Sequence, residues 1–237
     1  MPIINCDVRQ LEVNVAAYLS QDPILLEEVR NKVDIHEANK ERFHLPTRLI
    51  AKTFKFRLIY GGSAYSYAHD PDFKEVGYNE KQWQKVIDEY YNKYKGLAAW
   101  HTTIIQQAIE TGKLIMPTGR QFTFKPKVTP RGETVWPETT IKNYPVQGTG
   151  ADIMSIIRVD FGSRFKKERI DGVCVSTVHD SIVVDVADKD VDRTITLFNK
   201  CFADMPKNFE KIFKVPYNLP IFCEISVGPN MKDLTEV

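Results

Sequence analysis

The sequence lacks several features that mark broad classes of protein. Its 32 basic and 31 acidic side chains leave a net charge of +1 over 237 residues, so any anion-binding site must be built locally. The four cysteines show no CxxC spacing, and three lie in apolar, strand-like runs, which predicts reduced, buried thiols rather than disulfides or zinc ligands. No run reaches the roughly 18 apolar residues of a membrane span, and the N-terminus has no basic segment followed by an apolar one. We therefore expect a soluble, cytoplasmic protein without membrane contact.

The chain does contain enough apolar sequence for a core, since 43% of its residues are hydrophobic. Strand-like runs occur near both ends, with helical patterns between them. Asp34 and Glu37 form a capping box, which predicts that His36 lies in the first turn of a helix. A stretch with four prolines, residues 116–139, predicts a hairpin or an irregular excursion, and a further helix is expected to open near Gln147.

The stretch TVHDSIVVDV, Thr177 to Val186, has apolar and polar residues alternating on both sides of His179-Asp180. This period of two predicts an antiparallel hairpin with a two-residue tip. Such tips normally use Asn-Gly or Asp-Gly. A residue choice that departs from this local preference is expected at a functional site. A solvated turn is the alternative. Metal-dependent HD phosphohydrolases also use a His-Asp pair, but they place it on helices with further histidines, an arrangement that the five histidines here do not show.

A second pattern follows Thr47, where Arg48, Lys52, Phe56 and Tyr60 recur every four residues. At about 100° per residue, each step drifts by only about 40°, so the four side chains share one face of a helix. Two cations in the first turns oppose the helix dipole, which makes sense if an anion binds there. A triphosphate could lie against the cations while a base stacks near the aromatic rings. A solvated amphipathic face is the alternative.

Several stretches resemble the motifs of family A DNA polymerases, the bacterial polymerase I class and its phage relatives. CDVRQLEVNVAAYLSQD is similar to motif A, RLIAKTFKFRLIYGG to the motif B helix, and TVHDSIVVDV to motif C. NYPVQGTGADI, DIH and CEISVGPNM also resemble segments of the family. Any one motif is weak, whereas five in the family's order are specific, and the resemblance covers essentially the whole chain.

The resemblance implies an α+β fold, with an antiparallel palm sheet and a mostly helical fingers subdomain. This is the right-hand polymerase architecture without its thumb and exonuclease, so the chain would be the C-terminal palm and fingers portion. The palm would comprise residues 1–30 and 146–237, with the motif C hairpin at 173–186. The fingers would comprise residues 31–145, with the motif B helix at 48–61.

The implied reaction is template-directed DNA synthesis, in which deoxynucleotides are added to a primer 3′ end by two-metal phosphoryl transfer. In the family the strands that carry Asp7 and Asp180 are neighbours, so the two carboxylates and the backbone carbonyl of Val8 would bind two Mg²⁺ ions. Hard oxygen ligands suit Mg²⁺, and two ions about 4 Å apart can stabilise the attacking and leaving oxygens. Lys52 would be the acid that protonates the leaving pyrophosphate. The predicted catalytic residues are therefore Asp7, Asp180 and Lys52.

The resemblance also assigns residues that bind nucleotide and DNA. The predicted nucleotide-binding residues are Gln10, Glu12, His36, Arg48, Lys52, Phe56 and Tyr60. The predicted DNA-binding residues are Gly61, Asn143, Gln147 and His179. Arg48, Lys52 and His36 would hold the triphosphate, Phe56 would pack on the sugar and base, and Glu12 would close off the ribose 2′ side.

The sequence departs from the family pattern at a few positions. Ser181 stands at the third acidic position of motif C. Lys55 and Arg57 replace the usual Asn and Gly of the nucleotide helix, which adds positive charge, and Thr139 stands where bacterial members often have Arg. We expect these changes to alter rate and fidelity and to leave the reaction unchanged.

Six residues precede Asp7, so the earlier palm strands of the family lie outside this sequence. An incomplete palm would leave a sheet edge that needs another chain. We therefore expect, besides primer-template DNA and dNTPs, a second polypeptide that supplies the thumb and remaining palm and is a candidate to carry the exonuclease. A truncated enzyme is the alternative. The expected setting is the cytoplasm of a bacterium or of a phage-infected host.

Two other functions stay open. A single-subunit RNA polymerase shares the two aspartates and a similar lysine-tyrosine helix, but such enzymes usually have glycine where this chain has Glu12. A non-catalytic fragment that binds DNA or a partner polymerase is the other alternative. It is disfavoured because the chain retains Asp7, Asp180, Arg48 and Lys52.

Overall fold

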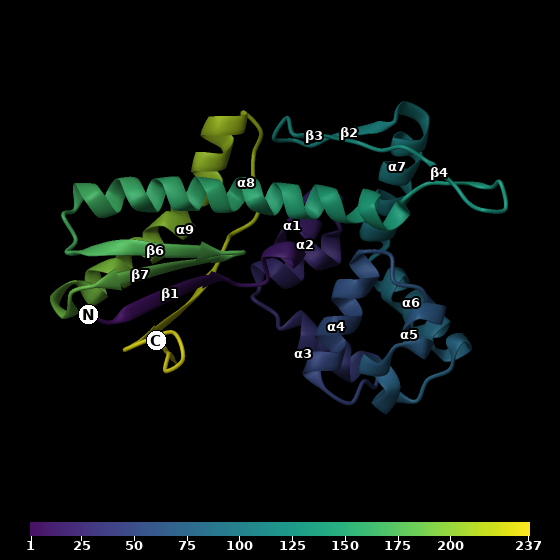
Figure 1. Cartoon of the computed structure of the whole chain (residues 1–237), viewed down its shortest axis with the longest axis horizontal. Coiled ribbons are helices and arrows are strands. Elements are labelled where there is room, and N and C mark those ends of the chain that lie inside the picture. The colour runs from purple at the N-terminus through teal and green to yellow at the C-terminus, as the bar shows by residue number, and fades with distance from the viewer. The chain divides into compact units, whose positions relative to one another are not determined.

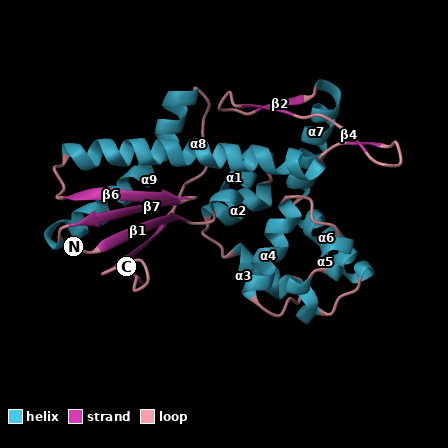
Figure 2. Ribbon diagram, in the orientation of Figure 1, coloured by secondary structure: helices cyan, strands magenta, loops and turns pink.

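The computed structural model describes residues 1–237, which form two compact units. The sheet unit comprises Met1–Val15 and Gly148–Val237, and the helical unit comprises Ala16–Gln147. Their limits fall inside two helices, α1 (Leu11–Ser20) and α8 (Glu138–Lys167). Strands of the main sheet gather in the sheet unit and helices dominate the other (Figure 2), which confirms the α+β class. The palm and fingers limits drawn from the sequence stay predictions.

The sheet unit is built on one antiparallel sheet. Its strands are β1 (Ile3–Val8), β6 (Gly172–Val178), β7 (Ser181–Val186), β8 (Cys223–Gly228) and β9 (Thr235–Glu236). They pair in the order β6-β7-β1-β8-β9, and Figure 1 shows β6, β7 and β1 side by side. In β1 the buried residues Ile4, Cys6 and Val8 alternate with half-buried ones, so one face of the sheet packs in the core.

The predicted hairpin is confirmed as β6 and β7, and its two-residue tip is His179-Asp180. His179 has φ 54°, in the left-handed region that a tight hairpin tip requires. Strand β7 is an inner strand and is almost fully buried. Strand β6 is an edge strand, exposed from Val173 to Val178, with a bulge between Cys174 and Ser176. The expectation of a buried thiol is therefore wrong for Cys174, which is exposed because its strand lies at the sheet edge.

Two further helical elements complete the sheet unit, the short η2 (Asp188–Asp190) and α9 (Val191–Phe213). Helix α9 packs against β8 and against α8, where the rings of Phe161 and Phe198 stack with centroids 3.9 Å apart. The apolar side of α9 is buried along most of its length, which is the pattern of an amphipathic helix covering a sheet.

Helix α8 begins at Glu138, earlier than the start near Gln147 expected from the sequence, and it continues through Pro145. Proline removes one backbone hydrogen bond from a helix interior, which is why the sequence favours a later start. The first turns are stabilised by tertiary packing, because Ile141 is fully buried in a cluster with Leu114 and other apolar side chains. Packing here outweighs local propensity.

The helical unit contains a series of mostly short helices. They are α2 (Pro23–Arg30), α3 (Ile35–Arg42), α4 (Arg48–Ile59), α5 (Ala64–His69), η1 (Pro71–Val76), α6 (Glu80–Lys93) and α7 (Lys95–Thr111). An aromatic core holds α4 in place: the Phe54 ring lies 5.6 Å from Trp83 and 5.1 Å from Tyr67. The Tyr67 hydroxyl also donates a 2.9 Å hydrogen bond to the Phe54 carbonyl oxygen.

Asp22 caps two helices at once. One carboxylate oxygen accepts the backbone N–H groups of Ile24 and Leu25 at the start of α2, at 3.0 and 2.9 Å. The other accepts those of Gly96 and Leu97 at the start of α7, at 2.7 and 3.2 Å. A Cβ at Gly96 would lie 2.7 Å from the Asp22 Cα, so only glycine allows this approach. The carboxylate is thereby satisfied although Asp22 is buried.

The proline-rich excursion forms two small hairpins between α7 and α8. The first pairs β2 (Lys113–Ile115) with β3 (Gln121–Thr123), and the second pairs β4 (Lys127–Val128) with β5 (Thr134–Val135). None of the helices is both long and apolar enough to cross a membrane.

Candidate active site

Two carboxylate residues meet at one end of the main sheet. Asp7 is in register with Ser181, the residue after Asp180. The Val8 N–H donates a 3.0 Å hydrogen bond to the Asp180 carbonyl oxygen, so the main chain fixes the hairpin tip against the end of β1. Residues directly opposite in antiparallel strands have Cα atoms about 4.5–5.5 Å apart. The backbone thus brings Asp7, Val8 and Asp180 together, with His179 exposed beside them.

This set of oxygens fits Mg²⁺. Carboxylates and a backbone carbonyl are the hard ligands that Mg²⁺ prefers. No three His, Cys, Asp or Glu side chains of residues 1–237 are arranged as a metal cage. Mg²⁺ is commonly bound by one or two carboxylates together with substrate phosphates and water. The Asp7 and Asp180 pair therefore suits an ion that is shared with a phosphate substrate.

The same end of the sheet holds a carboxylate that sequence reasoning did not single out. Glu224 of β8 is in register with Asp7, on the side away from β7. The Arg9 Nε lies 3.5 Å from a Glu224 carboxylate oxygen. The pairing of the last long strand with the first is visible only in the register. Ser181, at the third acidic position of motif C, donates its hydroxyl to the Val178 carbonyl oxygen at 3.0 Å and so stabilises the turn.

Gln10 and Glu12 lie where β1 turns into α1. Gln10 has φ 50°, and its carbonyl oxygen accepts the Asn14 N–H at 3.0 Å in the first helical turn. Glu12 follows in that turn, where the helix dipole favours an acidic side chain. The Arg9 N–H donates to the Phe222 carbonyl oxygen at 2.9 Å, which anchors the turn to the sheet unit.

The helical unit brings together the predicted phosphate-binding residues. Arg48 and Lys52 are exposed on α4, and the Lys52 ammonium lies 5.7 Å from the centre of the Phe56 ring. The His36 ring stacks on the Phe56 ring, and the two ring centroids lie 6.0 Å apart. The Arg48 Nε donates to an Asp34 carboxylate oxygen at 2.8 Å. The face of α4 therefore presents two cations and an aromatic ring, and His36 of α3 packs against that ring.

The charge states of this face follow from burial and neighbouring ions. Burial, followed by the positive charges of Lys55 and Arg48, lowers the pKa of His36 to about 3, so the ring is neutral at pH 7. Burial raises the pKa of Asp34, but hydrogen bonds from Arg48 and from the Glu37 N–H outweigh it and lower that pKa overall. The His36 Nδ1 is buried without a protein partner. His36 therefore adds no positive charge to this group of residues at pH 7.

The two unusual cations of α4 behave differently from expectation. Arg57 is bound to Asp70 and, at 2.6 Å, to Asp72, and its guanidinium lies 5.1 Å from the centre of the Phe73 ring. The prediction that Arg57 adds positive charge to the nucleotide helix is wrong, because two carboxylates neutralise it. Lys55 is 1% exposed and lies in the interior of the helical unit.

The end of α4 meets the first turns of α8 within the helical unit. The Gln147 amide donates a 2.7 Å hydrogen bond to the Tyr60 hydroxyl. Gly61 has φ 89°, and a Cβ there would lie 3.0 Å from the Thr139 hydroxyl oxygen. The Asn143 amide oxygen is buried without a protein partner. Tyr60, Gly61 and Gln147, all predicted site residues, thus lie together.

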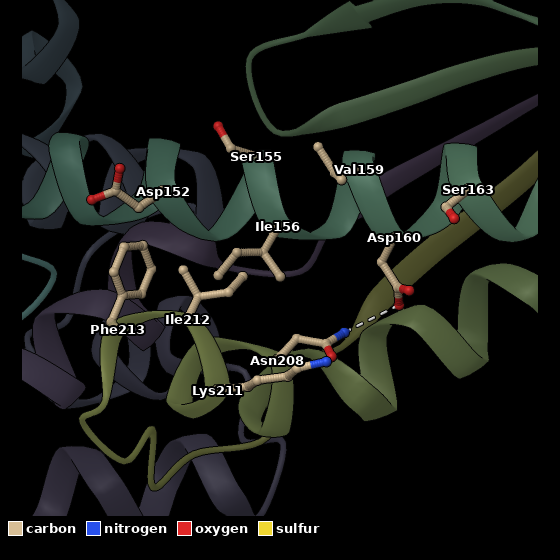
Figure 3. A pocket seen from close by; sticks show the side chains of 10 residues that line it. All are labelled: Asp152, Ser155, Ile156, Val159, Asp160, Ser163, Asn208, Lys211, Ile212 and Phe213. Carbon is tan, nitrogen blue, oxygen red and sulfur yellow. Dashed lines mark hydrogen bonds between the residues drawn. The ribbon is translucent and has the colours of Figure 1, made fainter.

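A groove in the sheet unit contains none of the predicted site residues. It lies between α8 and the end of α9, has a volume of about 470 Å³, and is spanned by a 3.2 Å hydrogen bond from Asn208 to Asp160 (Figure 3). Two carboxylates, those of Asp152 and Asp160, face it together with one cation, Lys211. This balance of charge does not suit a triphosphate.

Comparison with known proteins gives consistent relatives. DNA polymerase I of Pseudomonas aeruginosa is 31% identical over 201 residues, which are 81% of this chain and 21% of that enzyme. DNA polymerase I of Aquifex aeolicus is 28% identical over 211 residues, 82% of this chain and 34% of that enzyme. The chain thus spans about a fifth to a third of the length of these curated relatives.

A solved structure shares the fold. The POL domain of Pol1 from M. smegmatis, in complex with DNA primer-template and dNTP, superposes with a TM-score of 0.80 at 20% identity, over 96% of this chain and 39% of that one. This likeness confirms the predicted polymerase fold. The family model for DNA polymerase family A matches residues 1–233. A match over nearly the whole sequence shows that the chain belongs to DNA polymerase family A.

Proposed function

We propose that this chain catalyses template-directed DNA synthesis, adding deoxynucleotides to a primer 3′ end by two-metal phosphoryl transfer. The single observation that supports this most is the position of Asp7 beside the hairpin tip at Asp180, in a chain of DNA polymerase family A. The M. smegmatis POL domain is described with DNA primer-template and dNTP, and we propose the same partners for this chain.

Asp7, Asp180 and the carbonyl oxygen of Val8 hold two Mg²⁺ ions in this proposal. When bound, the ions stabilise the attacking oxygen of the primer and the leaving oxygen of pyrophosphate. The protein contributes oxygens whose positions are set by main-chain hydrogen bonds, such as that from Val8 to Asp180. Groups held in this way need little reorganisation during the reaction.

The face of α4 binds the incoming nucleotide. Arg48 and Lys52 supply positive charge for the triphosphate, and neutral His36 supplies a hydrogen bond. The Arg48 to Asp34 pair is half-exposed and contributes little stability, so a phosphate can take the place of the carboxylate. Lys52 donates a proton to the bridging oxygen as its bond to the α-phosphorus breaks. Phe56, next to Lys52, packs on the sugar and base.

The remaining predicted residues contact the ribose and the DNA. Glu12 excludes a ribose 2′-hydroxyl by its bulk, and Gln10 shapes the same part of the pocket. The residues proposed to flank the templating base or to touch DNA near the primer end are Tyr60, Gly61, Asn143, Gln147 and His179.

We further propose that residues 1–30 and 146–237 are palm and residues 31–145 are fingers, and that a second polypeptide supplies the thumb and the remaining palm. The open edge of β6 supports this. Its valines at positions 173, 175 and 178 are 57%, 56% and 50% exposed. A long apolar edge strand with unpaired N–H and C=O groups is a template for another strand.

Primer extension tests these proposals. The chain is assayed alone and with the product of the adjacent reading frame, with dNTPs and with rNTPs. We expect DNA synthesis by the complex and its loss with Asp180→Ala. Extension by the chain alone, at the rate of full-length relatives, would refute the second polypeptide. Full activity of Asp180→Ala would indicate a non-catalytic fragment, and a preference for rNTPs would indicate an RNA polymerase.

A further inference from the structure

One segment of the helical unit, residues 112–137 and here called the hairpin segment, carries an excess of positive charge. It holds five of the 32 cations and one of the 31 acids, so it carries +4 while the other 211 residues together carry −3. The cations are Lys113, Arg120, Lys125, Lys127 and Arg131, and the acid is Glu133. A net charge near zero for the whole chain therefore conceals a local field that attracts polyanions.

Three of these cations, Lys125, Lys127 and Arg131, are available to a ligand. All five are exposed. Lys125, Lys127 and Arg131 take part in none of the ion pairs of the helical unit. The second hairpin, β4 and β5, projects from the helical unit (Figure 1). Lys127 lies in its first strand and Arg131 in its turn, so both are presented on the projection.

The turn that carries Arg131 is ordered by the main chain. The Thr129 N–H donates to the Glu133 carbonyl oxygen, and the Gly132 N–H donates to the Thr129 carbonyl oxygen, both at 2.9 Å. Gly132 has φ 80°, a conformation that glycine adopts without strain. A ligand therefore binds cations on a preformed hairpin, which lowers the entropy lost on binding.

An aromatic ring packs against Phe122 and Phe124 of the hairpin segment. Tyr144, in the first turns of α8, is 47% exposed. Its ring is supported by Phe122 and Phe124, whose centroids lie 5.6 and 6.1 Å away. Phe124 is buried and directly precedes Lys125 in the chain. The hairpin segment thus presents exposed cations, and it also supports the half-exposed ring of Tyr144 in α8.

This combination identifies the class of ligand. Phosphate groups need the cations, and only unpaired bases expose faces that stack on an aromatic ring. In a duplex the base faces are stacked on one another and cannot reach the Tyr144 ring. An acidic peptide could bind the cations but has no bases to stack on that ring. We propose that the hairpin segment and Tyr144 bind single-stranded nucleic acid, with phosphates on Lys125, Lys127 and Arg131 and a base stacked on Tyr144. The proposed polymerase function enters only in naming the strand, which is the unpaired template.

Charge reversal tests the proposal against a matched control. The triple variant Lys125→Glu, Lys127→Glu, Arg131→Glu is compared with Lys74→Glu, Lys81→Glu, Lys85→Glu, which makes the same change of charge on exposed residues of η1 and α6. Anisotropy of a labelled dT15 oligonucleotide is measured at several salt concentrations. We expect the first variant to lose at least tenfold in affinity and about 2 in the slope of log K against log salt, since each single-strand phosphate contact contributes about 0.7. The control stays within about threefold of the parent chain.

Tyr144→Ala and Tyr144→Phe test the stacked base. We expect the alanine variant to bind dT15 at least fivefold more weakly and the phenylalanine variant to bind normally. Equal losses in both charge-reversal variants, or normal binding by Tyr144→Ala, would overturn the inference. Loss of binding to polyglutamate with unchanged binding to dT15 would also overturn it and assign the segment to an acidic protein. Primer extension is scored separately: a chain that binds dT15 through this segment but never extends a primer contradicts only the polymerase function.

Discussion

The two units position their site residues by different means. In the sheet unit, strand register and the Val8 to Asp180 hydrogen bond place the carboxylates, so the backbone itself sets their spacing. In the helical unit, the cations extend from one helix face, and Arg48 is held by a carboxylate of the neighbouring helix. The first arrangement is rigid before substrate arrives, whereas the second must exchange partners to bind a phosphate. Substitutions in the sheet unit should therefore remove chemistry, and those in the helical unit should also change substrate affinity.

The largest expected effect is that of Asp180→Ala. Two bound metal ions contribute several kcal/mol to the transition state, and each 1.36 kcal/mol is tenfold in rate, so we expect primer extension to fall by about 1000-fold or more. Because the backbone of the hairpin tip is unchanged, the temperature of unfolding should stay within a few degrees. Asp188→Ala, an exposed aspartate of η2, is the matched control. A comparable loss in the control would show that neither effect reports on metal binding.

Lys52→Ala should lower kcat by about 100-fold, the lower end of what a general acid contributes, and should also raise KM for dNTP. Lys52→Arg retains the charge but not an easily lost proton, so we expect it to restore KM more than kcat. Steady-state kinetics on the active complex separate the two, with Lys85→Ala on α6 as control. A change in KM alone would limit Lys52 to binding.

Glu12→Ala should reduce the preference for dNTP over rNTP, in kcat/KM, by about tenfold, because the smaller side chain leaves room for a 2′-hydroxyl. Glu12→Gln has nearly the same size and should retain the preference. The ratio is measured with paired dNTP and rNTP substrates on one primer-template. If the glutamine variant also lost discrimination, charge rather than bulk would be responsible.

The smallest effect concerns pH and stability. Burial lowers the pKa of His36 to about 3 and, with a further contribution from Lys142, that of His101 to about 3 as well. In the unfolded chain both histidines bind protons below about pH 6.5, whereas in the folded chain they do not until about pH 3. The contribution of the two neutral histidines to the free energy of unfolding is therefore fully present above pH 6.5. As the pH is lowered from 6.5 to 3, this free energy decreases by at most about 1.4 kcal/mol per pH unit for each histidine. The free energy of unfolding, measured with urea, should depend less steeply on pH in this window for His101→Gln than for the parent chain. An unchanged dependence on pH would contradict the lowered pKa of His101.

Local patterns were sufficient for some elements of this fold and insufficient for others. The alternation around His179-Asp180 predicted the hairpin, and the four-residue recurrence predicted the face of α4, because both depend on near neighbours. The predicted start of α8 is too late, because Pro145 locally disfavours a helix before it. The burial of Ile141, which stabilises the first turns, depends on residues far along the chain. The neutralisation of Arg57 likewise required knowing where Asp70 and Asp72 fold back.

The candidate site divides in the same way. The residue types for a two-carboxylate metal site were readable from motifs, but the approach of Asp7 to Asp180 rests on strand pairing between distant segments. The pairing of β1 with β8, on its other side, places Glu224 opposite Asp7, which no local pattern indicates. The neutral state of His36 also depends on its burial and on cations brought in by another helix.

Asp22 limits how this protein can be recombined with its relatives. One oxygen of its carboxylate caps α2, which begins directly after Asp22, and the other caps α7 through residues 74 and 75 positions further along the chain. The starts of α2 and α7 therefore share one acceptor group. A chimera with a crossover between them would deliver α7 without its anion, or leave a desolvated carboxylate facing a foreign side chain in place of Gly96. Asp22 and Gly96 must therefore be inherited as a pair, which makes residues 22–97 the shortest block that can be exchanged with both helix starts intact.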